Sequence, residues 1–464
     1  MSKKTVEAIH PLSPQQQGML FETLAAPRSG IHIEQLTCAL DGELDRSAFA
    51  RAWKALLDRH AVLRTAFAWQ DQPQPLQLVV RDLEMPIAEE DWRGLPAAET
   101  TARLQAFLEA DRRQDFKLSK PPLMRLALLD TGEGTRTLVW THHHILMDGW
   151  CRPVLLHELF SLYADFCLGR EPGLPPSRSY GDYIAWLGRQ DASRAEAFWS
   201  ESLRGFRRPT SLGRPVAAGA NGHSGHITLQ GSLPPGETAV LQALAQRLRV
   251  TLSTVVQGAW ALLLGRYSGE SDVVFGITTS GRPAELEGIE STIGLFINTL
   301  PLRVRLDPDE GLAEWLQRLQ AWNLELRRWE QVSSGQVHRW SEVPGALPLH
   351  ESILVFENYP VPSADPAARA GLTVRAGAGF STGGQTRQPL TVLVVPGAEL
   401  TVTLVHDPRR LPGSRRILDH FVSLLGRMAA APESPLVSLL ESIPEAEIPG
   451  FVPLVRSPAR EHLP

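Results

Sequence analysis

The segment THHHILMDGW places three histidines, His142, His143 and His144, shortly before the pair Asp148 and Gly149. Near neutral pH an unprotonated imidazole can take a proton from an amine or a hydroxyl group. A carboxylate four residues after the last histidine can brace the loop by pairing with a cation. A glycine leaves room for a substrate, and its backbone N–H at the start of a helix can donate to an oxyanion. Together these groups indicate an acyl-transfer site.

Two other interpretations of the histidines compete with this one. His142 and His144 share one face of an extended strand, and Asp148 could add a third metal ligand. However, the chain has no other His, Cys or Glu cluster at a recognisable ligand spacing, which argues against a metal. Burial in a strand with satisfied hydrogen bonds is the usual interpretation for a lone histidine, but the pattern HHxxxDG fixes four positions together. We therefore predict no metal site and favour acyl transfer.

Local patterns predict the elements that position this segment. Residues 135–145 alternate into an apolar strand with the histidines at its end, and residues 149–169 read as a helix that begins just after the Asp-Gly pair. An earlier helix opens at Asp45, a good N-cap, with apolar residues following at helical spacing. The histidines therefore belong to a strand, loop and helix unit.

The second half of the chain follows a similar plan. Residues 237–269 predict two helices, residues 271–282 and 294–306 predict strands, and residues 390–407 predict a hairpin. A Pro- and Gly-rich stretch at 169–179 is the clearest boundary between the halves. Helix and strand alternation on both sides of it predicts an α/β protein of two lobes of similar build.

Composition narrows the class of protein. The chain of 464 residues has 43% apolar and 21% charged residues, as in an ordinary globular protein. Its net charge of -5 argues against a general nucleic-acid binder, which needs a basic face. Three cysteines cannot build a disulfide framework, the N-terminus lacks a secretory pattern, and the most apolar run is too short to span a bilayer. We expect a cytoplasmic protein without a membrane partner.

The segment HHILMDGW resembles the signature of condensation domains of nonribosomal peptide synthetases, relatives of chloramphenicol acetyltransferase. Five further segments match motifs of that family in the expected order. They are LSPQQQGMLFETL, RHAVLRTAF, SYGDYIAWL, TTSGRPAELEGIESTIGLFINTLPLRV and, as a weaker match, QTRQPLTVLV. The resemblance therefore covers residues 10 to about 400.

The resemblance implies roles for the residues of the motif. His144, the second histidine of the pair, is expected to be catalytic, and Gly149 to line the substrate channel and offer its N–H. His143 is expected to face away and support the structure, whereas His142 lies outside the motif. Asp148 is expected to be structural and to pair with Arg282.

Three further residues and the fold follow from the same resemblance. Arg64 is expected to help hold the site, and Trp150 and Asn298 to lie at the tunnel or at the crossover between lobes. The implied fold is a V-shaped pseudo-dimer of two chloramphenicol acetyltransferase-like lobes with a central tunnel. The expected limits are residues 1–175 for the N-terminal lobe, 176–440 for the C-terminal lobe and 441–464 for a linker-like tail.

The implied activity is amide-bond formation in nonribosomal peptide biosynthesis. An acceptor amine attacks a donor acyl or peptidyl thioester, and both substrates arrive on phosphopantetheine arms of donor and acceptor peptidyl carrier proteins. No permanently bound cofactor is implied, and adjacent synthetase domains are further expected partners. Two alternatives stay open: a free-standing acyltransferase with a soluble acceptor, and a non-catalytic docking module of the same fold. His144 either removes the amine proton or positions the nucleophile.

Overall fold

A computed structural model describes residues 5–132, 134–212, 226–359, 366–376, 388–411 and 413–448. The chain forms two compact units. Unit 1 comprises residues 1–190, 281–297 and 359–385, and unit 2 comprises residues 191–280, 298–358 and 386–464.

This division differs from the two contiguous lobes expected from the sequence. The chain stays in unit 1 beyond residue 175 because helix α5 (Tyr180–Leu187) buries Tyr180 and Tyr183 against Phe296 of the same unit. The tail also differs, since Ile443 and Ile448 are buried in the core of unit 2. The rest of the expected linker, residues 449–464, lies outside the described residues.

Unit 1 is built on a sheet with the strand order β12-β2-β7-β6-β5. These strands are β12 (Thr373–Ala376), β2 (Ile33–Asp41), β7 (Thr135–His143), β6 (Met124–Gly132) and β5 (Ile87–Asp91). A second sheet has the order β1-β4-β3, from β1 (Val6–Pro11), β4 (Leu76–Val80) and β3 (Thr65–Ala68). The remaining elements are α1 (Pro14–Ala25), α2 (Arg46–Arg59), η2 (Ala61–Arg64), α3 (Ala97–Arg112), α4 (Cys151–Cys167), α5, η3 (Ile289–Ser291) and η4 (Pro366–Ala370).

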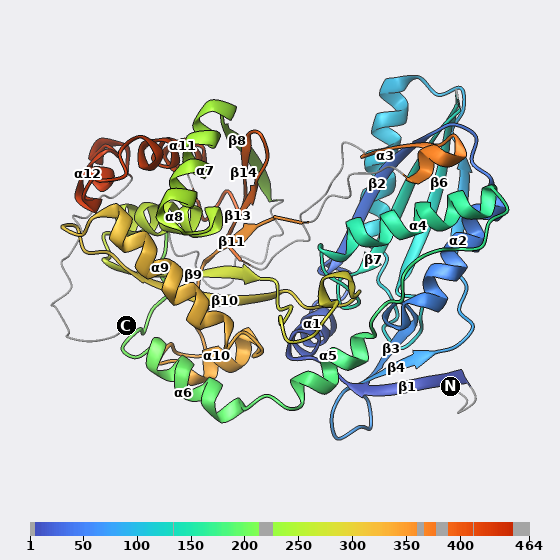
Figure 1. The fold of residues 1–464 in the computed structure, drawn as a ribbon, viewed down its shortest axis with the longest axis horizontal. Helices are drawn as coiled ribbons and strands as arrows, with labels where there is room; N and C mark the ends of the chain where they lie inside the picture. The colour runs from blue at the N-terminus through green and yellow to red at the C-terminus, as the bar shows by residue number, and fades with distance from the viewer. Residues whose placement is uncertain are drawn as a thin grey trace. The chain divides into compact units, whose positions relative to one another are not determined.

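The two faces of the β12-β2-β7-β6-β5 sheet are covered by different helices. Side chains alternate along each strand, so Leu138 and Trp140 of β7 join the core cluster that contains α2 and α4. Val139, between them, instead joins a cluster against Phe107 of α3. Helices α2 and α4 pack side by side (Figure 1). Asp45 caps α2 by accepting the N–H of Ala48, as the sequence predicted.

Unit 2 is built on a sheet with the order β10-β9-β11-β13-β14-β8. Its strands are β10 (Asn298–Arg305), β9 (Asp272–Thr279), β11 (Ser352–Phe356), β13 (Leu390–Val395), β14 (Leu400–His406) and β8 (Ile227–Leu233). Strand β11 runs parallel to β9 and β13, and β13 and β14 form the predicted antiparallel hairpin. The other elements are α6 (Ala192–Ser202), α7 (Pro235–Leu248), α8 (Leu252–Ser268), α9 (Leu312–Arg327), α10 (Ser334–Trp340), α11 (Ser414–Ala430), α12 (Leu436–Glu441) and η5 (Glu445–Glu447).

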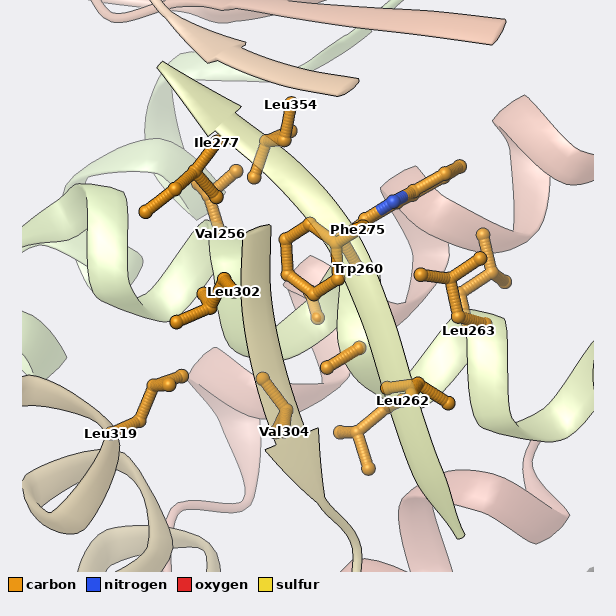
Figure 2. Packing of buried hydrophobic residues seen from close by; sticks show 14 of the residues in the cluster. Val256, Trp260, Leu262, Leu263, Phe275, Ile277, Leu302, Val304, Leu319 and Leu354 are labelled. Atoms are coloured by element: carbon orange, nitrogen blue, oxygen red, sulfur yellow. The ribbon is translucent and has the colours of Figure 1, made fainter. Parts of the chain in front are cut away.

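Helix α8 forms the centre of the unit 2 core. Its residues from Thr254 to Arg266 are buried, and Trp260 belongs to the same core cluster as Phe275 of β9 and Leu354 of β11 (Figure 2). Among the described residues no single helix is long and apolar enough to cross a membrane, although α7 and α8, bent by 104°, meet that test as a pair.

Candidate active site

The segment between β7 and α4 is anchored by its apolar residues. Ile145, Leu146 and Met147 are fully buried, and the turn is closed by hydrogen bonds from the Met147 N–H to the His144 carbonyl and from the Cys151 N–H to the Asp148 carbonyl. The polar side chains of the motif are therefore held by a packed loop. We call residues 144–150, which contain the residue expected to be catalytic, the catalytic loop.

His144 is held by both its backbone and its ring. Its N–H donates to the carbonyl of His32 at 2.8 Å, and Nδ1 lies 2.8 Å from the carbonyl oxygen of Met147. Because a carbonyl only accepts hydrogen bonds, Nδ1 must carry a proton, and in the neutral ring Nε2 is then unprotonated. The side chain is only partly buried. His144 therefore presents a fixed nitrogen that can take up a proton.

His143 has both ring nitrogens occupied. Nδ1 accepts the N–H of Ile145 at 3.1 Å. Nε2 lies 3.1 Å from the hydroxyl of Thr23, which itself donates to the carbonyl of Met19, so Nε2–H is the donor. Burial, followed by the charge of His32, holds the pKa of His143 well below its usual range. The ring is neutral and structural, on the face of the sheet opposite His142.

Asp148 is buried and forms the brace of the catalytic loop. Its carboxylate accepts Arg282 at 2.9 and 3.3 Å, and its Oδ2 also accepts the N–H groups of Phe296 and Ile297 at 3.0 and 3.1 Å. Burial opposes ionisation, but the Arg282 guanidinium and these donors still lower the pKa of Asp148. The carboxylate is thus committed to the brace, and no group of three or more metal-ligand residues occurs in the described parts of the chain.

Cys151 belongs to the same brace, which the sequence did not reveal. Its Sγ lies 3.3 Å from both Asp148 Oδ1 and the Gly294 carbonyl, and the Gly294 N–H donates to it. Burial, and then the negative charge of Asp148, raise the pKa of the thiol to about 12. Cys151 therefore remains a protonated packing group rather than a nucleophile.

Gly149 lies where two side chains approach the backbone closely. A Cβ at this position would lie 2.7 Å from Tyr359 Oη and 3.0 Å from a guanidinium nitrogen of Arg152. The Gly149 N–H has no acceptor among the described residues, as expected at the open start of α4. Next to it, the Trp150 indole donates to the Glu290 carbonyl at 2.8 Å, and its ring meets Tyr359 edge-on. Tyr359 was not predicted.

Two other predicted site residues, Arg64 and Asn298, form hydrogen bonds with groups outside this loop. Arg64 donates to the carbonyls of Leu57 and Val80 and to Glu7, so it caps the end of α2 and ties it to the β1-β4-β3 sheet. Asn298 belongs to unit 2, where its amide donates to the carbonyls of residues 330 and 332. Arg64 therefore satisfies carbonyls at the ends of α2 and β4, and Asn298 holds the segment between α9 and α10.

Comparison with protein families places this geometry in context. A model of the family described as "Condensation domain" matches residues 6–447. The chain belongs to the condensation-domain family. A linear gramicidin synthase of Brevibacillus parabrevis is 41% identical over 441 residues, which cover 93% of this chain and 9% of the relative. Bacitracin synthase 3 of Bacillus licheniformis is 36% identical over 409 residues, 87% of this chain and 6% of the relative. The chain thus spans only a small part of these relatives.

Solved structures of condensation domains share the fold. The first condensation domain of the calcium-dependent antibiotic synthetase, in complex with substrate analogue 3a, matches with a TM-score of 0.76 at 20% identity and covers 93% of this chain and 98% of that one. The starter condensation domain of rhizomide synthetase matches with a TM-score of 0.75 at 20% identity, over 93% and 99%. The predicted family and its α/β fold are confirmed, and with them the enzyme class, because condensation domains of such synthetases form amide bonds by acyl transfer.

Proposed function

We propose that this condensation domain joins an acceptor amine to a donor acyl or peptidyl thioester, with His144 as the general base. The observation that carries the proposal is the fixed tautomer of His144. Its Nδ1–H is held by the Met147 carbonyl, which leaves Nε2 as the proton acceptor on a partly exposed ring. Asp148 is bound by Arg282 and two backbone N–H groups, so it supports the loop rather than sharing the proton.

The reaction proceeds in two balanced steps. The amine nitrogen attacks the thioester carbonyl carbon, and His144 Nε2 takes the proton that the nitrogen loses. The carbonyl oxygen becomes an oxyanion, for which the free N–H of Gly149 is a candidate donor. When the tetrahedral intermediate collapses, the C–S bond breaks and the leaving thiolate takes the proton back from His144. The products are an amide and a free thiol, and the base is regenerated.

We further propose that both substrates are carried on phosphopantetheine arms of donor and acceptor carrier proteins. The relatives are large multidomain synthetases, of which this chain matches a single segment. Docking of a carrier raises the effective concentration of its arm at the site, so carrier-bound substrates are expected to react more efficiently than free thioesters.

The test is amide formation from two loaded carriers, followed by mass spectrometry of the product released from the acceptor arm. The same amine is supplied in parallel as a small soluble thioester. We expect an amide on the acceptor carrier and a higher kcat/KM for the carrier-bound amine. Equal efficiency for both forms would favour an acyltransferase with a soluble acceptor. No amide with any loaded pair, from a folded protein, would favour a docking module.

A further inference from the structure

A largely buried carboxylate, Glu34 of β2, lies on the same face of the sheet as the proposed catalytic histidine. In the register of β2 and β7, Glu34 is directly opposite His142, and Ile33 is opposite His143. Because side chains alternate, Glu34 and His142 share one face, and the position of His144, two residues on, lies diagonally across from Glu34. The backbone bond from the His144 N–H to the His32 carbonyl continues this pairing past the end of the strand.

The charge on Glu34 has an unusual setting. Its side chain is 12% exposed, and its ion pair is with Arg152 of α4, at 3.6 Å. Among the described residues no donor hydrogen-bonds the Glu34 carboxylate, and neither ring nitrogen of His142 has a partner. Buried carboxylates are normally hydrogen-bonded, because burial without partners is costly. Because a largely buried carboxylate without hydrogen-bond donors destabilises the fold, we look for a functional role of Glu34.

Electrostatics link this carboxylate to His144. Burial opposes ionisation of Glu34, but the positive charge that His144 can carry, and then those of Arg152 and Arg112, hold its pKa below the usual value. His142 itself stays neutral, since burial lowers its pKa to about 3. The Glu34 carboxylate is therefore ionised at neutral pH. Its ion pair with Arg152 is long, at 3.6 Å, so part of its negative charge can act on another cation.

We infer that Glu34 is the counter-ion of the reaction: it offsets the positive charge that His144 acquires when it takes the proton of the acceptor amine. This inference rests on the proposed role of His144 as the base. Glu34 acts through space on a ring already fixed by the Met147 carbonyl, so it is a positioning residue and touches no substrate. In a largely buried setting, a carboxylate charge on the same face of the sheet favours the protonated imidazole.

The other charged groups around His144 do not replace Glu34. His143 is buried and neutral, and Arg152 and Arg112 carry positive charge, which disfavours an imidazolium. The other nearby carboxylate, Glu22 of α1, is more exposed and pairs with His32 at 2.9 Å. Asp148 of the same loop is committed to Arg282 and two backbone N–H groups, so Glu34 is the largely buried carboxylate of β2 that faces the His144 side of the sheet.

The sign of the effect on the pH profile follows from this role. The base works only when unprotonated, and Glu34 favours the protonated ring. Replacing Glu34 by Gln removes that preference, so the loss of rate on the acid side should begin at a lower pH. At the plateau, the weaker stabilisation of the imidazolium should lower the single-turnover rate roughly tenfold, equivalent to about 1.4 kcal/mol.

The experiment measures single-turnover amide formation against pH for the wild type, Glu34→Gln, Glu34→Asp and Glu158→Gln. Glu158 is a matched control, because it is a buried carboxylate of unit 1 that pairs with Arg59 and His60 at the end of α2. We expect Glu34→Gln to be slower and to lose activity on the acid side at a lower pH than the wild type. Glu34→Asp should keep the wild-type pH profile. Glu158→Gln should change neither the rate nor the profile. Glu34→Asp also keeps the test valid if Glu34→Gln folds poorly.

Three outcomes overturn the inference. A Glu34→Gln profile and rate equal to the wild type, with His144→Ala inactive, would remove Glu34 from the mechanism and leave the proposed function intact. Equal losses for Glu34→Gln and Glu158→Gln, without a displaced pH profile, would make Glu34 a purely structural charge. Full activity of His144→Ala would instead remove the proposed base, and the counter-ion with it.

Discussion

Replacing Asp148 by Ala tests the brace beneath the catalytic loop. The substitution removes the acceptor of five hydrogen bonds, two from Arg282, one each from the N–H groups of Phe296 and Ile297, and one from the Cys151 thiol. The Arg282 side chain is 4% exposed and Asp148 1%, so solvent cannot take over these partners. Removing one partner of a buried ion pair typically costs about 3–5 kcal/mol. We expect a loss of this size in the free energy of unfolding.

The assay is urea denaturation monitored by tryptophan fluorescence, with activity measured on the folded fraction. The control is Asp58→Ala, which breaks the exposed pair between Lys54 and Asp58 and should cost at most about 0.5 kcal/mol. Activity should fall together with stability, because the loop is no longer held. Full stability with lost activity would refute the structural role and would assign Asp148 a direct part in the chemistry.

The pH dependence of stability provides a second check on the same pair. The pKa of Asp148 is lower in the folded chain than in the unfolded one, so its contribution is present above the ordinary value of about 4. The contribution is lost as the pH falls through the folded pKa. The difference in stability between the wild type and Asp148→Ala should therefore shrink in acid. A difference that grows as the pH falls would contradict the direction of this shift.

Two further substitutions separate packing from chemistry. His143→Ala should lower the melting temperature, because the N–H of Ile145 and the hydroxyl of Thr23 lose their partner. An unchanged melting temperature with lost activity would instead make His143 catalytic. Gly149→Val should keep the fold, because the Tyr359 side chain, 2.7 Å from the position of the new Cβ, can shift, but it should block turnover of the acceptor. Wild-type kinetics for Gly149→Val would show that acceptors do not pass this residue.

Local patterns in the sequence were sufficient for the elements around the site. The strand that ends in the histidines, the Asp45 cap and the helix after the Asp-Gly pair were predicted, because alternation, capping and helical spacing are properties of neighbouring residues. The pairing of Asp148 with Arg282 was expected from the family resemblance. No pattern within either segment required it, because the two residues are 134 positions apart.

The missed residues all depend on contacts that the sequence pattern does not encode. The pairing register of β2 and β7 brings Glu34 to the face of the sheet on which His142 lies. Tyr359 approaches Gly149 from residues 359–385, a segment of unit 1 that comes late in the chain. Strand β12 in the same returning region pairs with β2, and Arg375 pairs with Asp41 across 334 positions. Because residues 281–297 and 359–385 belong to unit 1, the units are not contiguous in the sequence, unlike the lobes that we expected.

The most direct test of the central claim, that His144 Nε2 is the base, is the single-turnover rate of amide formation between two loaded carriers for the wild type and His144→Ala. His157→Ala, on the helix α4 that follows the catalytic loop, is the matched control. We predict that His144→Ala folds normally and is slower by about 10²–10⁴-fold, whereas His157→Ala keeps the wild-type rate. A folded His144→Ala with the wild-type rate, under conditions where the chemical step limits turnover, would contradict the account.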